Sequence, residues 1–174
     1  MGDIGIVDDA TKQWFRYRAV ALIIRDHKLL AATTDAVDYF YTVGGGIHLG
    51  ETAEAAVVRE VREESGLNIS AVRPVGIVEN FFTLDAKPFG WYDAHEVAQY
   101  FVVEVEGDID TSLDIVTGET DTHGVPESLV WIPLDQLDCY RGKPLFPTVV
   151  GERFVPKILM QDDALIHVVQ DSRK

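Results

Sequence analysis

The sequence has little positive charge and a single cysteine. Against 29 acidic residues it has only 15 lysines and arginines, which gives a formal net charge of −14. Proteins that bind nucleic-acid backbones need clustered basic side chains, so this balance argues against a nucleic acid polymer as partner. Cys139 alone cannot form an internal disulfide, which fits the reducing cytoplasm where we expect the protein to be located.

Long apolar runs are also lacking. None approaches the ~18 residues of a membrane-spanning helix, and residues 1–4 show neither the basic nor the apolar part of a signal peptide. We therefore expect no membrane as partner. With 174 residues, of which 47% are hydrophobic, the chain can bury a substantial core. We predict one domain over residues 1–174, with an N-terminal arm at 1–13.

Periodicity and turn residues divide the chain into elements. Strands are expected over residues 17–25, 28–34, 38–43, 69–82, 95–105, 128–132 and 165–169. Helices are expected over residues 52–66, 134–137 and 148–161, the last interrupted by Pro156. Residues 83–94 and 107–127 are predicted to be long loops, which in compact domains often serve function.

The most informative segment is G-G-I-H-L-G-E-T-A-E-A-A-V-V-R-E-V-R-E-E-S-G-L at residues 45–67. Thr52 can cap a helix here, and Gly66 can end it in a left-handed conformation. At about 100° per residue, the apolar side of this helix continues into a side that carries Glu60, Glu63 and Glu64. A solvated charged face would instead lie opposite the apolar side.

Three clustered carboxylates raise one another's pKa unless a cation lies among them. Carboxylate oxygens suit hard cations such as Mg²⁺ or Mn²⁺, which proteins use to handle polyphosphates. An isolated E-x-x-E-E is more often a surface helix with Glu–Arg pairs. The pattern here is longer: a glycine, five residues, Glu51, seven residues, and then R-E-V-R-E-E-S-G-L at residues 59–67.

This pattern resembles the signature of the Nudix hydrolase superfamily at every defining position. The resemblance implies an α/β fold, an α/β/α sandwich around a mixed central sheet, with the signature as a loop–helix–loop. It also implies a Mg²⁺- or Mn²⁺-dependent pyrophosphohydrolase that acts on a small nucleoside diphosphate derivative. Val43 stands where many relatives have proline, so we expect a looser glycine turn.

Site residues follow from the same resemblance. The carbonyl of Gly45 and the carboxylates of Glu60, Glu63 and Glu64 are expected to bind the metal. Arg59 and Glu51 are expected to hold these ligands in place.

The general base is less determined by the sequence. Many relatives have a carboxylate in the loop before the strand that contains Trp131, and Glu127 matches this position approximately. Glu60 and Glu63 are alternatives as the base. Glu79 and Glu96 are rivals to Glu127.

Residues outside the signature are interpreted as contacts to the substrate. Arg16 and Arg18 are placed to meet a phosphate, with a plain surface position as the alternative for Arg18. Trp91 and Tyr92, in the expected loop 83–94, can stack on a nucleobase. The alternative is that these aromatic side chains pack on their own loop or on a second copy in a homodimer.

The string V-E-N-F-F at residues 78–82 and the later pair His95-Glu96 resemble bacterial Nudix proteins described as nucleotide or ADP-ribose pyrophosphatases. One alternative function is a nucleotide-sensing domain that keeps the fold without the chemistry, but such relatives usually lose signature carboxylates. A second alternative, an isomerase on this fold, needs a catalytic cysteine near the site, and Cys139 comes late in the chain.

Overall fold

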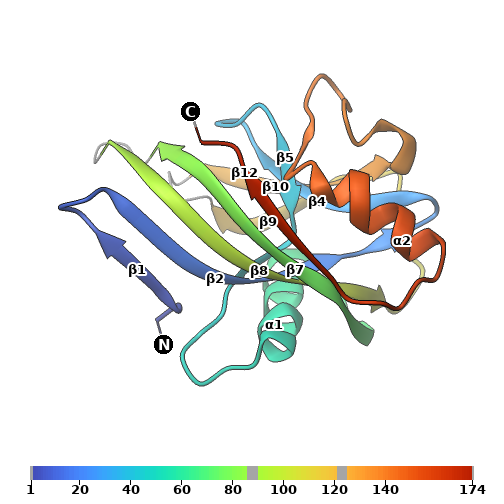
Figure 1. The fold of residues 1–174 in the computed structure, drawn as a ribbon. Helices are drawn as coiled ribbons and strands as arrows, with labels where there is room; N and C mark the ends of the chain where they lie inside the picture. Colours follow the sequence, from blue (N-terminus) through green and yellow to red (C-terminus); the bar gives the residue numbers. More distant parts are fainter. Residues whose placement is uncertain (1, 86–89, 121–124, 174) are drawn as a thin grey trace.

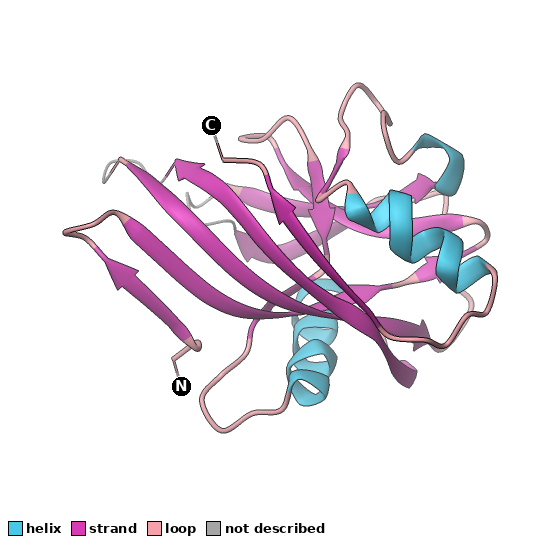
Figure 2. Ribbon diagram, viewed as in Figure 1, coloured by secondary structure: helices cyan, strands magenta, loops and turns pink. Residues whose placement is uncertain are grey.

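In a computed structural model the chain forms two six-stranded sheets with a helix on either side (Figures 1 and 2). The structure describes residues 2–85, 90–120 and 125–173. The strands are β1 Gly5–Asp8, β2 Gln13–Leu22, β3 Ile24–Arg25, β4 Lys28–Thr34, β5 Phe40–Thr42, β6 Gly44–Gly46, β7 Ile69–Asp85, β8 Trp91–Val105, β9 Ile115–Thr120, β10 Pro126–Pro133, β11 Leu145–Phe146 and β12 Ile166–Asp171. The helices are α1 Ala53–Ser65, the 3-10 turn η1 Leu134–Gln136, the π-helical turn η2 Val150–Phe154 and α2 Val155–Leu159.

Both sheets are mixed, which confirms the predicted α/β fold with mixed strands. The first has the order β1-β2-β8-β7-β12, with β6 also pairing with β2, and the second has the order β11-β5-β4-β10-β9, with β3 on β4. Strands β2 and β8 run parallel, whereas β7 and β8 are antiparallel. The strands are thus divided between two sheets rather than held in one central sheet.

Two apolar cores lie on opposite faces of the first sheet. One contains Val20, Ala98 and Val78 together with Phe154 and Val155 from the α2 region. The face of β2, β8 and β7 that carries these residues is called the α2 face below. The opposite face is called the α1 face, because its side chains pack with the buried side of α1 in the second core.

Helix α1 forms as its sequence predicts. The Thr52 hydroxyl accepts a hydrogen bond from the Ala55 N–H at 3.1 Å, and Gly66 has a left-handed φ of 68°. Ala56, Val57 and Val61 are buried against the sheets. Because both end signals are local, they place the helix without knowledge of the tertiary fold.

The two expected long loops were wrong. Strand β7 continues to Asp85 and β8 begins at Trp91, so most of residues 83–94 belongs to an antiparallel pair, and Lys87, Pro88 and Phe89 lie outside the described residues. The segment 107–127 contains β9, which pairs with β10. Pairing between strands stabilises both segments as strands, and this contribution is not visible in local composition.

The chain ends also differ in detail from expectation. The arm at 1–13 contains β1, which pairs with β2. The predicted helix at 148–161 is a π-helical turn followed by the short α2. Within the described ranges, no helix has both the length and the apolar character needed to cross a membrane.

Candidate active site

The glycine turn is a short strand held against β2. Gly44 has a φ of +127°, and a side chain there would place its Cβ 2.2 Å from the Ala19 carbonyl oxygen. Val43 is fully buried, and its carbonyl accepts a hydrogen bond from the Ala21 N–H at 3.0 Å. The looser turn expected from Val43 is therefore wrong, because this side chain anchors the turn in the core.

Gly45 lies directly against the first carboxylate of α1. A Cβ on Gly45 would come within 2.6 Å of the Glu60 carboxylate. Only a residue without a side chain leaves room for that carboxylate beside the turn. The structure thus brings together two of the residues expected to bind a metal, the Gly45 backbone and Glu60.

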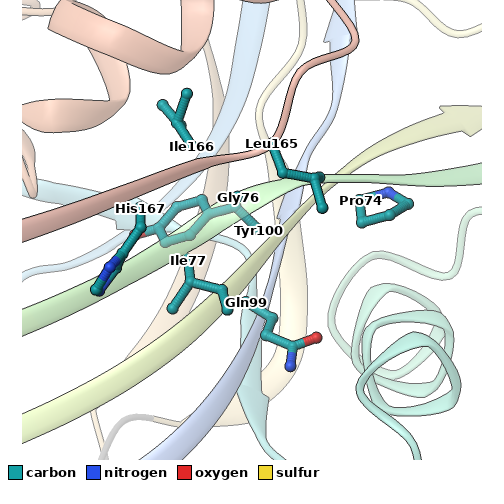
Figure 3. A pocket seen from close by; sticks show the side chains of 8 residues that line it. All are labelled: Pro74, Gly76, Ile77, Gln99, Tyr100, Leu165, Ile166 and His167. Atoms are coloured by element: carbon teal, nitrogen blue, oxygen red, sulfur yellow. The ribbon is translucent and has the colours of Figure 1, made fainter.

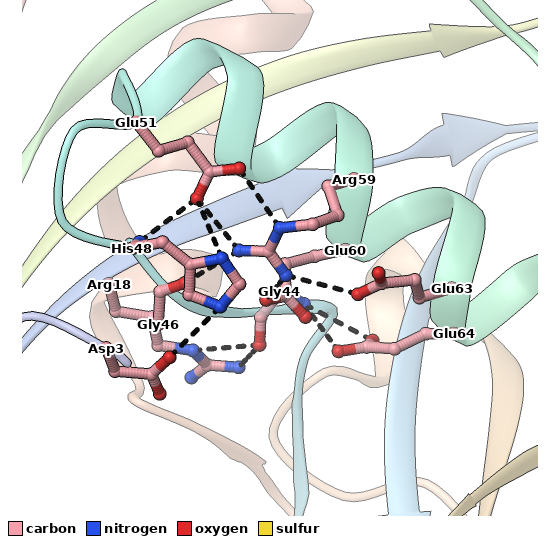
Figure 4. A network of polar contacts seen from close by, with 10 residues as sticks. All are labelled: Asp3, Arg18, Gly44, Gly46, His48, Glu51, Arg59, Glu60, Glu63 and Glu64. Carbon is pink, nitrogen blue, oxygen red and sulfur yellow. Dashed lines mark hydrogen bonds and ion pairs between the residues drawn. The ribbon is translucent and has the colours of Figure 1, made fainter. Parts of the chain in front are cut away.

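Arg59 links the carboxylates of the loop and the helix (Figure 4). Its Nε and Nη2 each donate to Glu51 at 3.0 Å, and Nη2 also donates to the Gly46 carbonyl at 2.9 Å. Its Nη1 donates to Glu63 at 3.1 Å and to Glu60. Arg59 therefore fixes the distance between the glycine turn and the carboxylate side of α1.

Glu51 and His48 complete this network at the start of the signature. The hydrogen bond from Arg59 and the one from the His48 N–H lower the pKa of Glu51 to about 2. The His48 ring lies 3.3 Å from an Asp3 oxygen, so it is held by the N-terminal segment.

Glu64 and Glu127 approach one another from different elements. The Gly44 N–H donates to both oxygens of Glu64 at 3.3 Å. Glu127, on β10, is 9% exposed and accepts a hydrogen bond from the Tyr41 hydroxyl at 2.5 Å. Burial, followed by the charge of Glu127, raises the pKa of Glu64 to about 8.

The same effects act on neighbouring groups. Burial raises the pKa of Glu60, and burial together with the hydrogen bond to Glu127 raises the pKa of Tyr41. The site thus collects negative charge in a poorly solvated place, which is costly without a compensating positive charge.

Arg18 supplies part of that positive charge from β2. It is 8% exposed, and it donates to the Gly44 carbonyl at 3.0 Å and to the Thr42 carbonyl at 2.7 Å. The surface position considered for Arg18 is therefore wrong. Its guanidinium lies behind the glycine turn and holds it in place.

The donor set suits a hard cation. Carboxylate and carbonyl oxygens are the ligands that Mg²⁺ and Mn²⁺ prefer, and Gly45 leaves open the space that a Cβ would fill beside Glu60. Within residues 2–85, 90–120 and 125–173, no three His, Cys, Asp or Glu side chains already converge as a metal-binding group. In this arrangement Glu51, Glu60 and Glu63 are paired with Arg59 instead.

Trp91 and Tyr92 do not lie at this site. Trp91 is seven residues along β8 from Ala98, the partner of Arg18, which corresponds to about 23 Å of strand. Tyr92 is 5% exposed, and its hydroxyl contacts Asp9 and Lys12. The expected loop was wrong at these two positions, because both belong to β8.

The two rival carboxylates are also engaged elsewhere. Glu79 lies on the α1 face between His167 at 2.6 Å and His95 at 3.6 Å. Glu96 lies on the α2 face and is paired with Arg16. A groove on the α1 face contains none of the predicted site residues (Figure 3). Its lining consists of Pro74, Gly76, Ile77, Gln99, Tyr100, Leu165, Ile166 and His167.

Sequence reasoning missed Tyr41 and the role of Gly44. Tyr41 reaches Glu127 only because β4 pairs with both β5 and β10, and no local pattern encodes that contact. For Gly44 a signal was present, since three consecutive glycines commonly mark a backbone that approaches another closely.

Comparison with known proteins agrees with this geometry. A family model described as the NUDIX domain matches residues 14–149. The chain is 27% identical over 93 residues to a protein described as a candidate mutator, MutT4, from Mycobacterium tuberculosis. That match covers 53% of this chain and 32% of the relative, so the chain spans about a third of that protein's length.

Solved structures show the same fold. The MutT NUDIX hydrolase from Burkholderia pseudomallei aligns with a TM-score of 0.54 and 21% identity, over 79% of this chain and 95% of that one. An ADP-ribose pyrophosphatase from Streptococcus suis aligns with a TM-score of 0.56 and 16% identity, over 88% and 98% respectively. At such identities the likeness concerns the fold.

Proposed function

The chain belongs to the NUDIX family, and on that premise we propose that it is a Mg²⁺- or Mn²⁺-dependent pyrophosphohydrolase. Its substrate is a nucleoside diphosphate linked to another moiety, of the nucleotide sugar, ADP-ribose or nucleoside triphosphate type. The products are a nucleoside monophosphate and a phosphate-bearing remainder, or pyrophosphate from a triphosphate. The observation that carries this proposal is the meeting of Glu60 and Glu64 from α1 with Glu127 from β10 beside the glycine turn.

Glu60, Glu63, Glu64 and the Gly45 carbonyl would hold the cation. When bound, it would offset the charge of the diphosphate and act as a Lewis acid. Arg59 keeps the carboxylates at a fixed distance from the turn through its contacts to Glu51 and the Gly46 carbonyl. Glu60 and Glu63 each pair with Arg59 through one carboxylate oxygen, so the other oxygen of each would be available to the cation.

We assign proton removal from the attacking water to Glu127. It comes from the strand opposite α1, outside the Arg59 network, and the Tyr41 hydroxyl orients its carboxylate. A base must lie within hydrogen-bond reach of the proton it takes, and Glu127 lies close enough to Glu64 for its charge to act on that carboxyl. Glu63 is less suited, because its side chain is 54% exposed and pairs with Arg59.

The test is a screen of ADP-ribose, nucleotide sugars and nucleoside triphosphates in the presence of Mg²⁺. A phosphatase that acts on monoesters but not on intact diphosphates reports cleavage of the first two classes, and a pyrophosphatase reports cleavage of the third. We expect turnover of at least one class. No turnover of any class with either Mg²⁺ or Mn²⁺ would contradict the proposal.

Glu64→Gln gives the screen its site-specific control. Removal of charge stabilisation at a metal site typically costs on the order of 10²-fold in kcat. The variant should fold about as stably as the unaltered protein, because burial raises the pKa of Glu64 to about 8 and glutamine matches the size and neutrality of the protonated carboxyl. Glu54→Gln, in the exposed first turn of the same helix, is the matched variant and should retain full activity.

A further inference from the structure

A polar row crosses the α2 face of the first sheet next to the active site. The strand register places Arg16 on β2 beside Glu96 on β8, and Glu96 beside Asn80 on β7. Asn80 and Glu96 come from the two strings, V-E-N-F-F and His95-Glu96, to which the proposed chemistry assigns no role. The row therefore joins two separate sequence features at one place.

The row lies two residues along β2 from Arg18, which contacts the glycine turn of the proposed catalytic centre. Arg16 and Arg18 are two residues apart on β2, so both point to the α2 face at a spacing of about 7 Å. Arg18 donates to the Gly44 carbonyl at the glycine turn. A substrate whose diphosphate lies at that turn can thus extend along β2 and reach Arg16.

Arg16 is held rigidly and remains accessible. Its Nε donates to a Glu96 oxygen at 2.5 Å, and its Nη2 contacts the same oxygen. The guanidinium carbon lies 5.0 Å from the centre of the Trp14 ring, and Trp14 in turn meets Phe82 edge to face at 6.4 Å. The Arg16 side chain is 33% exposed, whereas that of Glu96 is 5% exposed.

The charge of Arg16 is largely balanced by Glu96. A phosphate would therefore gain little electrostatic attraction from Arg16. The Glu96 carboxylate, which is 5% exposed, would also repel a second anion. A neutral planar group fits better, because guanidinium and indole rings offer flat surfaces on which nucleobases stack. The remaining N–H groups of an arginine fork can donate to base or ribose oxygens.

Asn80 adds a buried polar side chain to the row. It is 2% exposed, and its Oδ1 has no hydrogen-bond partner among the described residues. Such an unpaired acceptor costs stability, and a leucine of similar size would avoid that cost. The row thus has the character of a site rather than of a structural core.

From this arrangement we propose that Arg16 binds the nucleoside half of the substrate, with the nucleobase against the flat Trp14–Arg16 surface and Glu96 as the residue that positions Arg16. This inference rests on the proposed function, because it takes the diphosphate to lie at the glycine turn. It identifies the nucleoside, and not the variable moiety beyond the diphosphate, as the part that lies over β2.

The test compares Arg16→Lys and Glu96→Gln with the unaltered protein by calorimetry. The probes are the four common ribonucleoside 5′-monophosphates, inorganic phosphate and inorganic pyrophosphate, each with Mg²⁺ present. We expect both variants to weaken binding of the preferred monophosphate about tenfold or more, as for a lost hydrogen bond to a charged group. Pyrophosphate, which lacks a nucleoside, should bind with an affinity changed by less than about twofold.

Matched variants are available near the C-terminal end of β8, one on β8 itself and one on β3 of the second sheet. Arg25→Lys alters an arginine that donates to the Val105 and Gly107 carbonyls, and Glu104→Gln alters an exposed carboxylate on β8. Neither control variant should change the affinity for the monophosphate or for pyrophosphate. With a substrate from the screen, Arg16→Lys should raise KM and leave kcat within about threefold, since the contact forms equally in the ground and transition states.

Three results would overturn the inference. Equal losses for monophosphate and pyrophosphate would assign Arg16 to a phosphate, and unchanged affinities would leave it a purely structural role. No tighter binding of any monophosphate than of inorganic phosphate by the unaltered protein would exclude a nucleoside subsite. These binding results decide the inference even if the screen finds no hydrolysis, so failure of the two proposals can be told apart.

Discussion

Arg59 is the side chain that ties the carboxylates of the site into one unit. Its guanidinium contacts Glu51, Glu60 and Glu63 together with the Gly46 carbonyl. A lysine at this position would lack the planar fork needed for so many simultaneous contacts. The spacing of Glu51 and Arg59 in the sequence therefore reflects a contact between the loop and the second turn of α1.

The pairing of Glu51 predicts a specific dependence of stability on pH. Its pKa is lowered from 4.5 to about 2, so the pairing stabilises the folded protein fully above about pH 4.5 and is lost as the pH falls toward 2. We expect Glu51→Gln to lower the melting temperature at pH 7, with a difference from the unaltered protein that shrinks below pH 4.5. Melting curves across this range check it.

Glu54→Gln is the control for the pH series, because Glu54 is exposed three residues away. It should give no difference that changes with pH. A Glu51→Gln difference that stays constant from pH 7 to pH 3 would contradict the assigned pairing.

At the level of single residues, the sequence could predict what lies on one helix. Glu60, Glu63 and Glu64 share a side of α1 by spacing alone, and the structure keeps them beside one another. Tyr41 could not be predicted, because its contact to Glu127 joins residues 86 positions apart in the chain. Contacts of this kind depend on which strands pair.

The glycine turn β6 is the element that lies beside the carboxylates proposed to bind the cation, and two of its glycines have different roles. The nearest atoms to a Cβ on Gly45 would be the end of the flexible Glu60 side chain, whereas a Cβ on Gly44 would meet the backbone of Ala19. Gly44 also has a φ that disfavours other residues.

This difference predicts separate effects for two alanine substitutions. Gly45→Ala should fold with nearly unchanged stability but lose most of its turnover, because Glu60 is displaced. Gly44→Ala should lower the free energy of unfolding by about 2 kcal/mol or more, as strained backbone and a collision combine. Urea unfolding and kcat measured on the same samples separate the two, and equal loss of stability in both variants would contradict the assignment.

Among the elements, α1 and β4 were predictable from the sequence. The β7–β8 pair was predicted only in part, because its end at residues 83–85 and 91–94 was missed. The caps of α1 are local, and β4 occupies the predicted residues 28–34. Residues 83–94 were predicted to be a loop that contains Pro88, Gly90 and clustered aromatic residues. In the structure residues 83–85 and 91–93 pair with one another, from Thr83 with Asp93 to Asp85 with Trp91.

At the scale of the whole molecule, the first sheet holds the proposed catalytic centre and the Trp91 end of β8 far apart. Trp91 lies about 23 Å of strand from the partner of Arg18, and its side chain is on the α1 face, opposite the Arg16 row. Its 61% exposure also leaves it without the burial that would make it important to the core.

We therefore expect Trp91→Ala to leave both KM and kcat within about twofold of the unaltered protein, since surface changes away from a site usually have small effects. Steady-state kinetics with the substrate found in the screen check this. A rise in KM of tenfold or more would show that Trp91 contacts the substrate, contrary to the placement described above.

The most direct test of the metal-dependent centre is the activity of the intact protein before and after removal of divalent cations. The preparation is incubated with excess chelator, assayed, and assayed again after addition of Mg²⁺ or Mn²⁺. Because Glu60, Glu63 and Glu64 concentrate negative charge beside the glycine turn, we predict that hydrolysis falls to background with chelator and returns with either cation. Full activity in the presence of the chelator would contradict the assignment of these carboxylates.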